Sequence, residues 1–169
     1  LNSVMNNLNF AVESMSRKMR VGTTYHCEFS NSIPPPDINT PKDCAGGGQL
    51  IAFEPSGGTP GDSSDQIVYR INGTHIEKSE SGGAAGTFIN ITAPEVVIES
   101  LNFYVEGTSI SDNLQPKIVM VIRGSAGAIF VLNSLNLFFP LSNRIFRYSW
   151  APILPWYPHL HTCRLVSCS

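Results

Sequence analysis

The feature that most restricts the fold is the first 21 residues, which contain neither proline nor glycine. Their apolar side chains recur every three or four positions, the period that gives an α-helix one apolar face. Ser3 is suited to cap the start of such a helix, and Gly22 follows its last turn. We therefore expect an amphipathic helix over residues 3–20. Its packing face consists of Val4, Leu8, Ala11, Val12, Met15 and Met19.

After this segment the pattern changes to short strands. Residues 22–48 contain four prolines and predict an irregular stretch. Runs rich in β-branched and aromatic residues follow at 49–53, 66–71, 74–78, 87–92, 96–105, 117–122 and 128–139. Asn72-Gly73 predicts a tight hairpin, and the run at 117–122 is expected to pair with 96–105. One helix followed by strands predicts an α+β domain, with the helix packed on an antiparallel sheet.

The composition changes at about residue 133. Residues 133–169 contain both tryptophans, four prolines and no acidic residue. They follow neither a helical nor a strand period, so we expect a domain over residues 1–132 and an irregular tail over 133–169. Two interpretations of this tail are open. It is either a non-native reading frame at the end of the gene or an apolar tip that contacts another subunit.

The charges argue against nucleic acid as a partner. All 13 acidic residues lie within residues 1–112, and residues 113–169 hold five scattered basic ones. Proteins that bind DNA or RNA cluster basic side chains on one face or along one helix. Five scattered basic residues do not form such a stripe, and nucleic-acid binding is not expected.

The cysteines bear on the cellular compartment. Cys27 and Cys44 are 17 positions apart and flank the proline-rich stretch, whereas Cys163 and Cys168 lie at the C-terminal end. Paired cysteines around an irregular loop indicate a disulfide and an oxidising compartment, and two reduced thiols are the alternative. In the chain-entropy model, a disulfide that closes a loop of this length stabilises the fold by about 3 kcal/mol.

Catalytic patterns are absent from the sequence. His26 precedes Cys27, but neighbouring strand residues point to opposite faces, which separates a nucleophile from its base. The glycines at 46–48 lack the Gly-Lys-Ser/Thr ending of a phosphate-binding loop and predict a flexible turn. We expect no enzyme and no cofactor.

Two sets of residues could ligate a metal, and neither has the spacing of a known site. The zinc-capable set lies in the tail, where nothing resembles the two spaced pairs of a structural zinc site. The acidic set lies on loops, and its spacing matches no calcium-binding loop, so solvated charges are the simpler interpretation. No metal is therefore expected. The two sets are His159, His161, Cys163 and Cys168, and Asp37, Asp43, Asp62 and Asp65.

Several stretches within residues 1–130 resemble type IV pilins and pseudopilins, the prepilin-type proteins. They are Val-Glu-Ser-Met-Ser-Arg at 12–17, Arg-Val-Gly at 20–22 followed by Cys27, Cys-Ala-Gly-Gly-Gly at 44–48, and Ile-Thr-Ala-Pro-Glu-Val-Val-Ile-Glu-Ser-Leu at 91–101. The resemblance implies a structural subunit, a minor pilin or pseudopilin, of a type IV pilus or type II secretion-like filament. It implies a location in the bacterial cell envelope or an extracellular filament.

The resemblance also implies partners. The helix would cover the sheet on one side and contact other pilin subunits on the other, and Cys27 and Cys44 would staple the loop after it. The full-length precursor would cross the inner membrane once, through an apolar segment upstream of Leu1 that is not in this sequence. The loops at 54–66 and 106–116 are further expected contact surfaces, because loops on rigid scaffolds carry recognition.

A secreted β-rich adhesin or carbohydrate-binding module is the alternative function. Its candidate contact residues are the aromatics Tyr104, Trp150 and Trp156. About 20 apolar residues directly before Leu1 would favour the pilin, and a cleaved signal peptide would favour the module. A hydrolase with a dispersed active site is a third interpretation, in which substitution of His26 or His75 would abolish activity.

Overall fold

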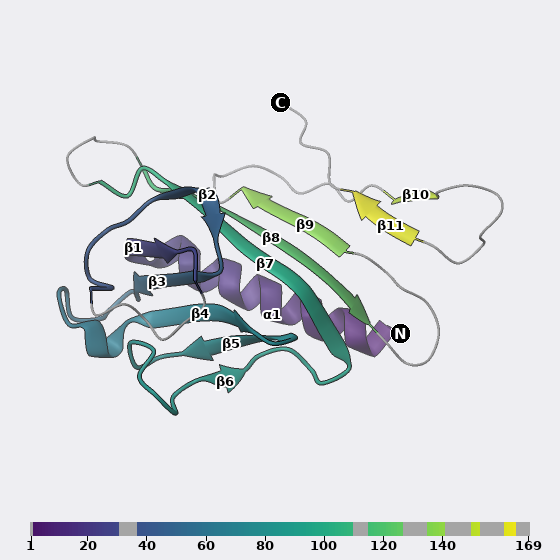
Figure 1. Cartoon of the computed structure of the whole chain (residues 1–169), viewed down its shortest axis with the longest axis horizontal. Helices are drawn as coiled ribbons and strands as arrows, with labels where there is room; N and C mark the ends of the chain where they lie inside the picture. Colours follow the sequence, from purple (N-terminus) through teal and green to yellow (C-terminus); the bar gives the residue numbers. More distant parts are fainter. Residues whose placement is uncertain are drawn as a thin grey trace.

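The structure is a computed structural model that describes residues 2–30, 37–109, 115–126, 135–140, 150–152 and 161–164. Helix α1 (Asn2–Val21) comes first and strands follow it, so the predicted α+β class is confirmed (Figure 1). A short 3₁₀ helix, η1 (Ser63–Asp65), precedes β4. The strands are β1 (Thr23–Glu28), β2 (Cys44–Gly48), β3 (Leu50–Glu54), β4 (Ile67–Asn72), β5 (His75–Ser79), β6 (Ile89–Asn90), β7 (Val96–Glu106), β8 (Lys117–Ala126), β9 (Leu135–Pro140), β10 (Trp150–Pro152) and β11 (His161–Arg164).

The strands form two sheets. One has the order β1-β3-β4-β5-β6, and the other has the order β10-β11-β9-β8-β7-β2. Neighbouring strands are antiparallel except for the parallel pair β9 and β11. The two predicted pairings are confirmed: β7 pairs with β8, and Asn72 faces His75 across a turn in which Gly73 has a φ of 57°. A positive φ is what a tight hairpin turn requires and glycine supplies at little cost.

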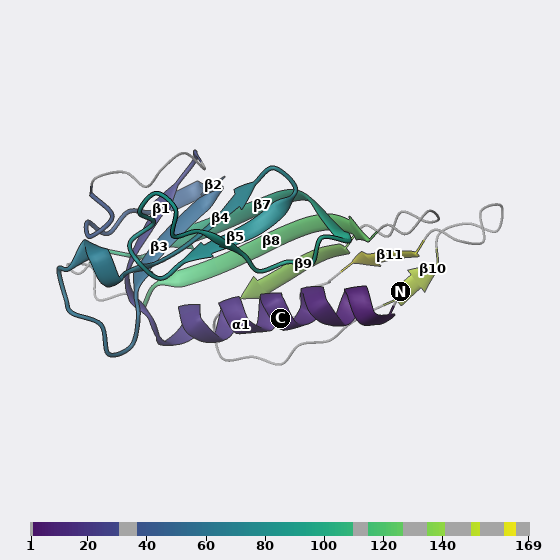
Figure 2. The same ribbon diagram turned by 90° about the horizontal axis from the view of Figure 1, so that it is seen from below.

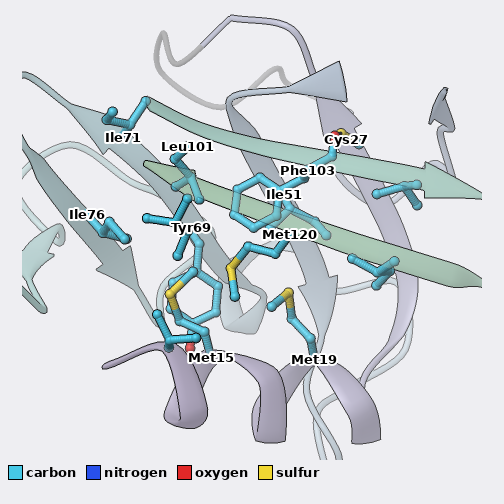
Figure 3. Packing of buried hydrophobic residues seen from close by; sticks show 14 of the residues in the cluster. Met15, Met19, Cys27, Ile51, Tyr69, Ile71, Ile76, Leu101, Phe103 and Met120 are labelled. Atoms are coloured by element: carbon cyan, nitrogen blue, oxygen red, sulfur yellow. Dashed lines mark hydrogen bonds between the residues drawn. The ribbon is translucent and has the colours of Figure 1, made fainter. Parts of the chain in front are cut away.

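The main core lies between α1 and the strands. Figure 2 shows α1 running along one side of the two sheets, and Figure 3 shows Met15 and Met19 pointing from it toward Tyr69 and Met120. These four side chains belong to one buried apolar cluster that includes residues of both sheets. The helix therefore covers both sheets rather than a single one, and the two halves of the chain share a core.

Strand β3 is buried on both faces, which explains why its sequence shows no alternation. Ile51 and Phe53 join the cluster under the helix, whereas Leu50 and Ala52 join a second, smaller cluster with Ile38 on the other face. A strand covered on both sides reads as a continuous apolar run.

The prediction that residues 22–48 are irregular is wrong at both ends. β1 pairs with β3, and β2 pairs with β7. β1 contains a bulge, in which its register shifts between Thr23 and His26 and Thr24 has a φ of 52°. The glycines at 46–48 belong to β2 rather than to a flexible turn. A Cβ on Gly48 would lie 2.5 Å from the carbonyl oxygen of Glu28, so close approach of β1 requires glycine there.

Three short strands lie within residues 133–169, where an irregular tail was expected. β9 pairs with β8, so the six-stranded sheet extends into the β-rich run at 128–139. β11 pairs with β9 and β10. The rest of 133–169 lies outside the described residues, and both interpretations of its origin stay predictions.

Candidate functional site

Helix α1 has one buried face and one exposed face. The buried side chains are those of the predicted packing face together with Ser16; Val4 lies outside the residues whose side chains are described. The described members of that face are Leu8, Ala11, Val12, Met15 and Met19, each at most 4% exposed. The helix is thus attached to the sheets by a continuous apolar stripe rather than by scattered contacts.

The exposed face carries a row of side chains at steps of four, three and four residues: Asn6, Phe10, Glu13 and Arg17. Phe10 is 74% exposed, the most exposed of the large apolar side chains in the described ranges. Arg17 donates to Glu13 across 2.8 Å, an exposed pair that stabilises a helix by only about 0.3 kcal/mol. Val21, at the end of the helix, is also exposed. The row therefore combines an apolar group with opposite charges, and it contributes little to the fold.

The C-terminal end of α1 is held by Tyr25. Its hydroxyl oxygen lies 2.6 Å from the carbonyl oxygens of both Met19 and Gly22. The Met19 carbonyl belongs to the last turn of the helix and also accepts a 3.4 Å hydrogen bond from the backbone N–H of Gly22, so Tyr25 adds a second donor there. Burial raises the pKa of Tyr25 to about 12, so the hydroxyl keeps its proton. Gly22 also lies against the ring of Phe53, with no room for a Cβ. The helix end is consequently fixed to β1 and β3.

Polar contacts hold the rest of the helix. Lys18 donates to Glu80 across 2.7 Å, and Lys78 pairs with the same carboxylate. Hydrogen bonds from these two lysines lower the pKa of Glu80 to about 2. Toward the N-terminus, the side-chain oxygen of Asn7 accepts a 3.0 Å hydrogen bond from the backbone of Ala93. The helix is therefore held along its length, and its exposed face is presented in one orientation.

The disulfide joins Cys27 of β1 to Cys44 of β2, with the two Cα atoms 5.7 Å apart. β1 is an edge strand of the five-stranded sheet and β2 is an edge strand of the six-stranded sheet. The bond therefore ties the two sheets together as well as closing the loop between them. Because Cys27 is in a disulfide, its sulfur has no thiolate to act as a nucleophile.

The two histidines considered as catalytic groups lie in structural surroundings. His26 is buried, with Nδ1 2.6 Å from the carbonyl oxygen of Thr40 and Nε2 3.1 Å from a carboxylate oxygen of Glu28. Both of its ring nitrogens therefore already have protein partners. His75 is half-buried in β5, and its Nδ1 has no hydrogen-bond partner within the described parts of the chain.

All four predicted loop acids accept hydrogen bonds from other residues of the chain. Asp37 accepts from Thr40, and Asp43 accepts from the backbone of Gly107 and Thr108. Asp62 caps the short η1 helix by accepting from the backbone and hydroxyl of Ser64. These contacts give Asp37, Asp43 and Asp62 a structural role in their loops.

The fourth acid, Asp65, lies with Glu54 at the base of the loop between β3 and β4. Asp65 Oδ2 accepts a 2.7 Å hydrogen bond from the backbone of Thr59. Glu54 is only 5% exposed. Burial raises the pKa of the Glu54 carboxyl, the nearby charges of Asp65 and Asp62 raise it further, and the side-chain amide of Gln66 partly opposes this rise. The sequence did not single out Glu54, because nothing in its local pattern distinguishes it from the end of an ordinary strand.

Several predicted residues cannot be placed. The side chains of the zinc-capable set and of both tryptophans lie outside those that the structure describes, as does much of the loop at 106–116. Within the described residues, no three His, Cys, Asp or Glu side chains form a metal-binding group by themselves. No helix in the same ranges has the length and apolar character needed to cross a bilayer. Protein-family models, curated proteins and solved structures contain no match to this chain.

Proposed function

We propose that this chain is the ectodomain of a filament assembly subunit of the pilin or pseudopilin class. The observation that carries the proposal is the exposed face of α1. Its row of side chains includes the largely exposed Phe10, and the opposite face of the helix is buried. A largely exposed phenylalanine on a rigidly held helix is suited to packing against a neighbouring subunit, because aromatic residues are enriched at protein interfaces.

The spacing of the row supports packing against another helix. Residues four and three apart form the ridges with which two helices interdigitate. The Glu13 and Arg17 charges beside Phe10 would fix the register of neighbouring helices, since charged groups at the rim of an interface contribute more to specificity than to affinity. Other copies or other subunits of the same filament are thus the expected partners, and no nucleic acid is expected.

The disulfide supports a location outside the cytoplasm. Disulfides between buried cysteines persist in oxidising compartments such as the periplasm and the cell surface. On this proposal the subunit lies in the bacterial cell envelope or in an extracellular filament. Its precursor would be held in the inner membrane by a segment encoded upstream of Leu1.

A pair of charge substitutions in the full-length protein tests the proposal in its native host. Phe10→Lys places a charge in the middle of the exposed row. Ile89→Lys is the matched control, because Ile89 is also a large exposed apolar residue, at 61% against 74% for Phe10, and lies on β6. Both variants should fold with an unchanged Tm, because exposed substitutions alter stability little. The amount of the subunit recovered in the sheared filament fraction should fall at least tenfold for Phe10→Lys and should not change for Ile89→Lys.

The contrary result is normal incorporation of Phe10→Lys into filaments. Release of the wild-type protein into the medium as an unattached molecule would also contradict an assembly role, and it would favour the adhesin or carbohydrate-binding module.

A further inference from the structure

The loop between β3 and β4 gathers buried oxygen atoms that have no donor. Among the described residues, both carboxylate oxygens of Glu54, Oδ1 of Asp65 and the side-chain oxygen of Gln66 are buried without a hydrogen-bond partner. Native proteins pair nearly all such groups, so four at the base of one loop require an explanation. Ionised carboxylates only accept hydrogen bonds, and a group that satisfies them must be a donor or a cation.

The two carboxylates converge on the same part of the loop. Oε1 of Glu54 lies against Gly58, where any Cβ would overlap it. Asp65 Oδ2 is bonded to the backbone N–H of Thr59, the next residue. Both acids therefore lie beneath the dipeptide 58–59, and the glycine leaves the space that the Glu54 carboxylate occupies. The φ of Gly58 is not positive, and a larger residue at this position would require the Glu54 carboxylate to move.

Hydrogen bonds between two side-chain amides determine which atom of the Gln66 amide has no hydrogen-bond partner. Asn39 donates its side-chain N–H to the carbonyl oxygen of Gly61 across 2.9 Å. The oxygen of the same amide accepts a 2.7 Å hydrogen bond from Nε2 of Gln66. Reversing either amide would place two oxygens or two N–H groups against each other, so the orientation is determined by the network. Gln66 is fully buried, and its remaining oxygen Oε1 is an acceptor.

We propose that Glu54 and Asp65, with Gln66 as a neutral oxygen donor, form a calcium site beneath the β3–β4 loop. Calcium takes six to eight oxygen ligands from carboxylates, side-chain amides, backbone carbonyls and water, in flexible geometry. Two carboxylates and an amide match this preference, whereas zinc prefers nitrogen and sulfur ligands. This assignment departs from the expectation of no metal. It does not rest on the proposed function.

The site is not one that a sequence motif or a count of acidic residues would find. Only two carboxylates contribute, and the third nearby acid, Asp62, is occupied with η1. The ligands come from the end of β3, the end of η1 and the residue between η1 and β4. A bound calcium ion would join these three segments and hold the loop against β4.

Thermal unfolding of the purified ectodomain with and without calcium tests the proposal. With a Kd of about 10⁻⁴ M, the range of extracellular calcium modules, 10 mM CaCl₂ should raise the Tm by about 5 °C relative to EDTA. MgCl₂ should give a smaller shift, because magnesium demands six short octahedral bonds and loses water reluctantly. Calorimetric titration of the metal-depleted protein should show one calcium site per chain.

Glu54→Gln should abolish the calcium shift, whereas the control Asp37→Asn, which changes an exposed loop acid elsewhere, should retain it. If Glu54→Gln does not fold, calorimetry on Asp65→Asn replaces it and should show at least tenfold weaker calcium binding. Three results would overturn the proposal: no calcium shift in the wild type, an equal shift with magnesium, or an unchanged shift after loss of either carboxylate. The first of these is expected if a proton, rather than a cation, satisfies Glu54.

Discussion

Met15 and Phe10 lie five residues apart on one helix and have opposite surroundings. Met15 is fully buried in the cluster shared by the two sheets, whereas Phe10 is 74% exposed. Both are large and apolar, so hydrophobicity alone does not distinguish them. The difference shows that α1 serves the fold through one face and leaves the other face exposed, and substitutions on the two faces should have separable effects.

The largest effect on stability is expected on the buried face. Met15→Ala should lower the free energy of unfolding by about 3 kcal/mol, because it removes buried methylenes and leaves a cavity under both sheets. Phe10→Ala is the matched control and should change it by less than about 0.5 kcal/mol. Urea denaturation of the two variants measures the difference. Equal losses would mean that Phe10 is part of the core and that the two faces are not distinct.

A similar or slightly smaller effect is expected at the junction of the sheets. Replacing both Cys27 and Cys44 by alanine should cost about 3 kcal/mol, because the disulfide restricts the unfolded chain. A reducing agent should lower the Tm of the wild-type protein to about that of the double variant. It should leave the Tm of the double variant unchanged. A wild-type Tm that does not respond to reduction would contradict a stabilising disulfide.

The smallest effect is expected where a polar group holds the helix. The pKa of Glu80 is lowered to about 2 in the folded protein, from about 4.5 for an ordinary glutamate. A lowered pKa stabilises the fold above pH 4.5, and this contribution is lost as the pH falls from about 4.5 toward 2. The gain is small because the Glu80 side chain is 56% exposed and solvent screens the interaction.

Glu80→Gln should therefore reduce the Tm slightly at pH 6 and leave it nearly unchanged at pH 2. Glu95→Gln, which changes an exposed acid before β7, is the control and should not show this pattern. A Tm difference between wild type and Glu80→Gln that persists at pH 2 would show that the carboxylate charge is not its cause.

The helix and the hairpins could be predicted because their signals are local. The apolar period of α1 and the Asn72-Gly73 turn are both contained within a few consecutive residues. The formation of this helix and this turn depends little on how the rest of the chain folds. Periodic segments and turns with special backbone needs are the parts of a fold that a single sequence specifies best.

The arrangement of the strands could not be predicted in the same way. β1 and β2 were missed because a bulge interrupts one and three glycines weaken the other, and each is stabilised by a partner distant in sequence. The division into two sheets follows from such pairings, which alternation does not encode. The candidate calcium site was missed for a related reason. Glu54, Asp65 and Gln66 meet only because β3 and β4 bring the two ends of a loop together.

The most direct test of an assembly role is cross-linking through the exposed face in assembled filaments. With Cys163 and Cys168 replaced by serine, Phe10→Cys provides one reactive thiol on that face, and Ile89→Cys provides the control. Treatment with a short bismaleimide should give covalent dimers or higher species through position 10, and far fewer through position 89. Abundant cross-links through position 89 with none through position 10 would contradict the assignment of this helix face as the assembly surface.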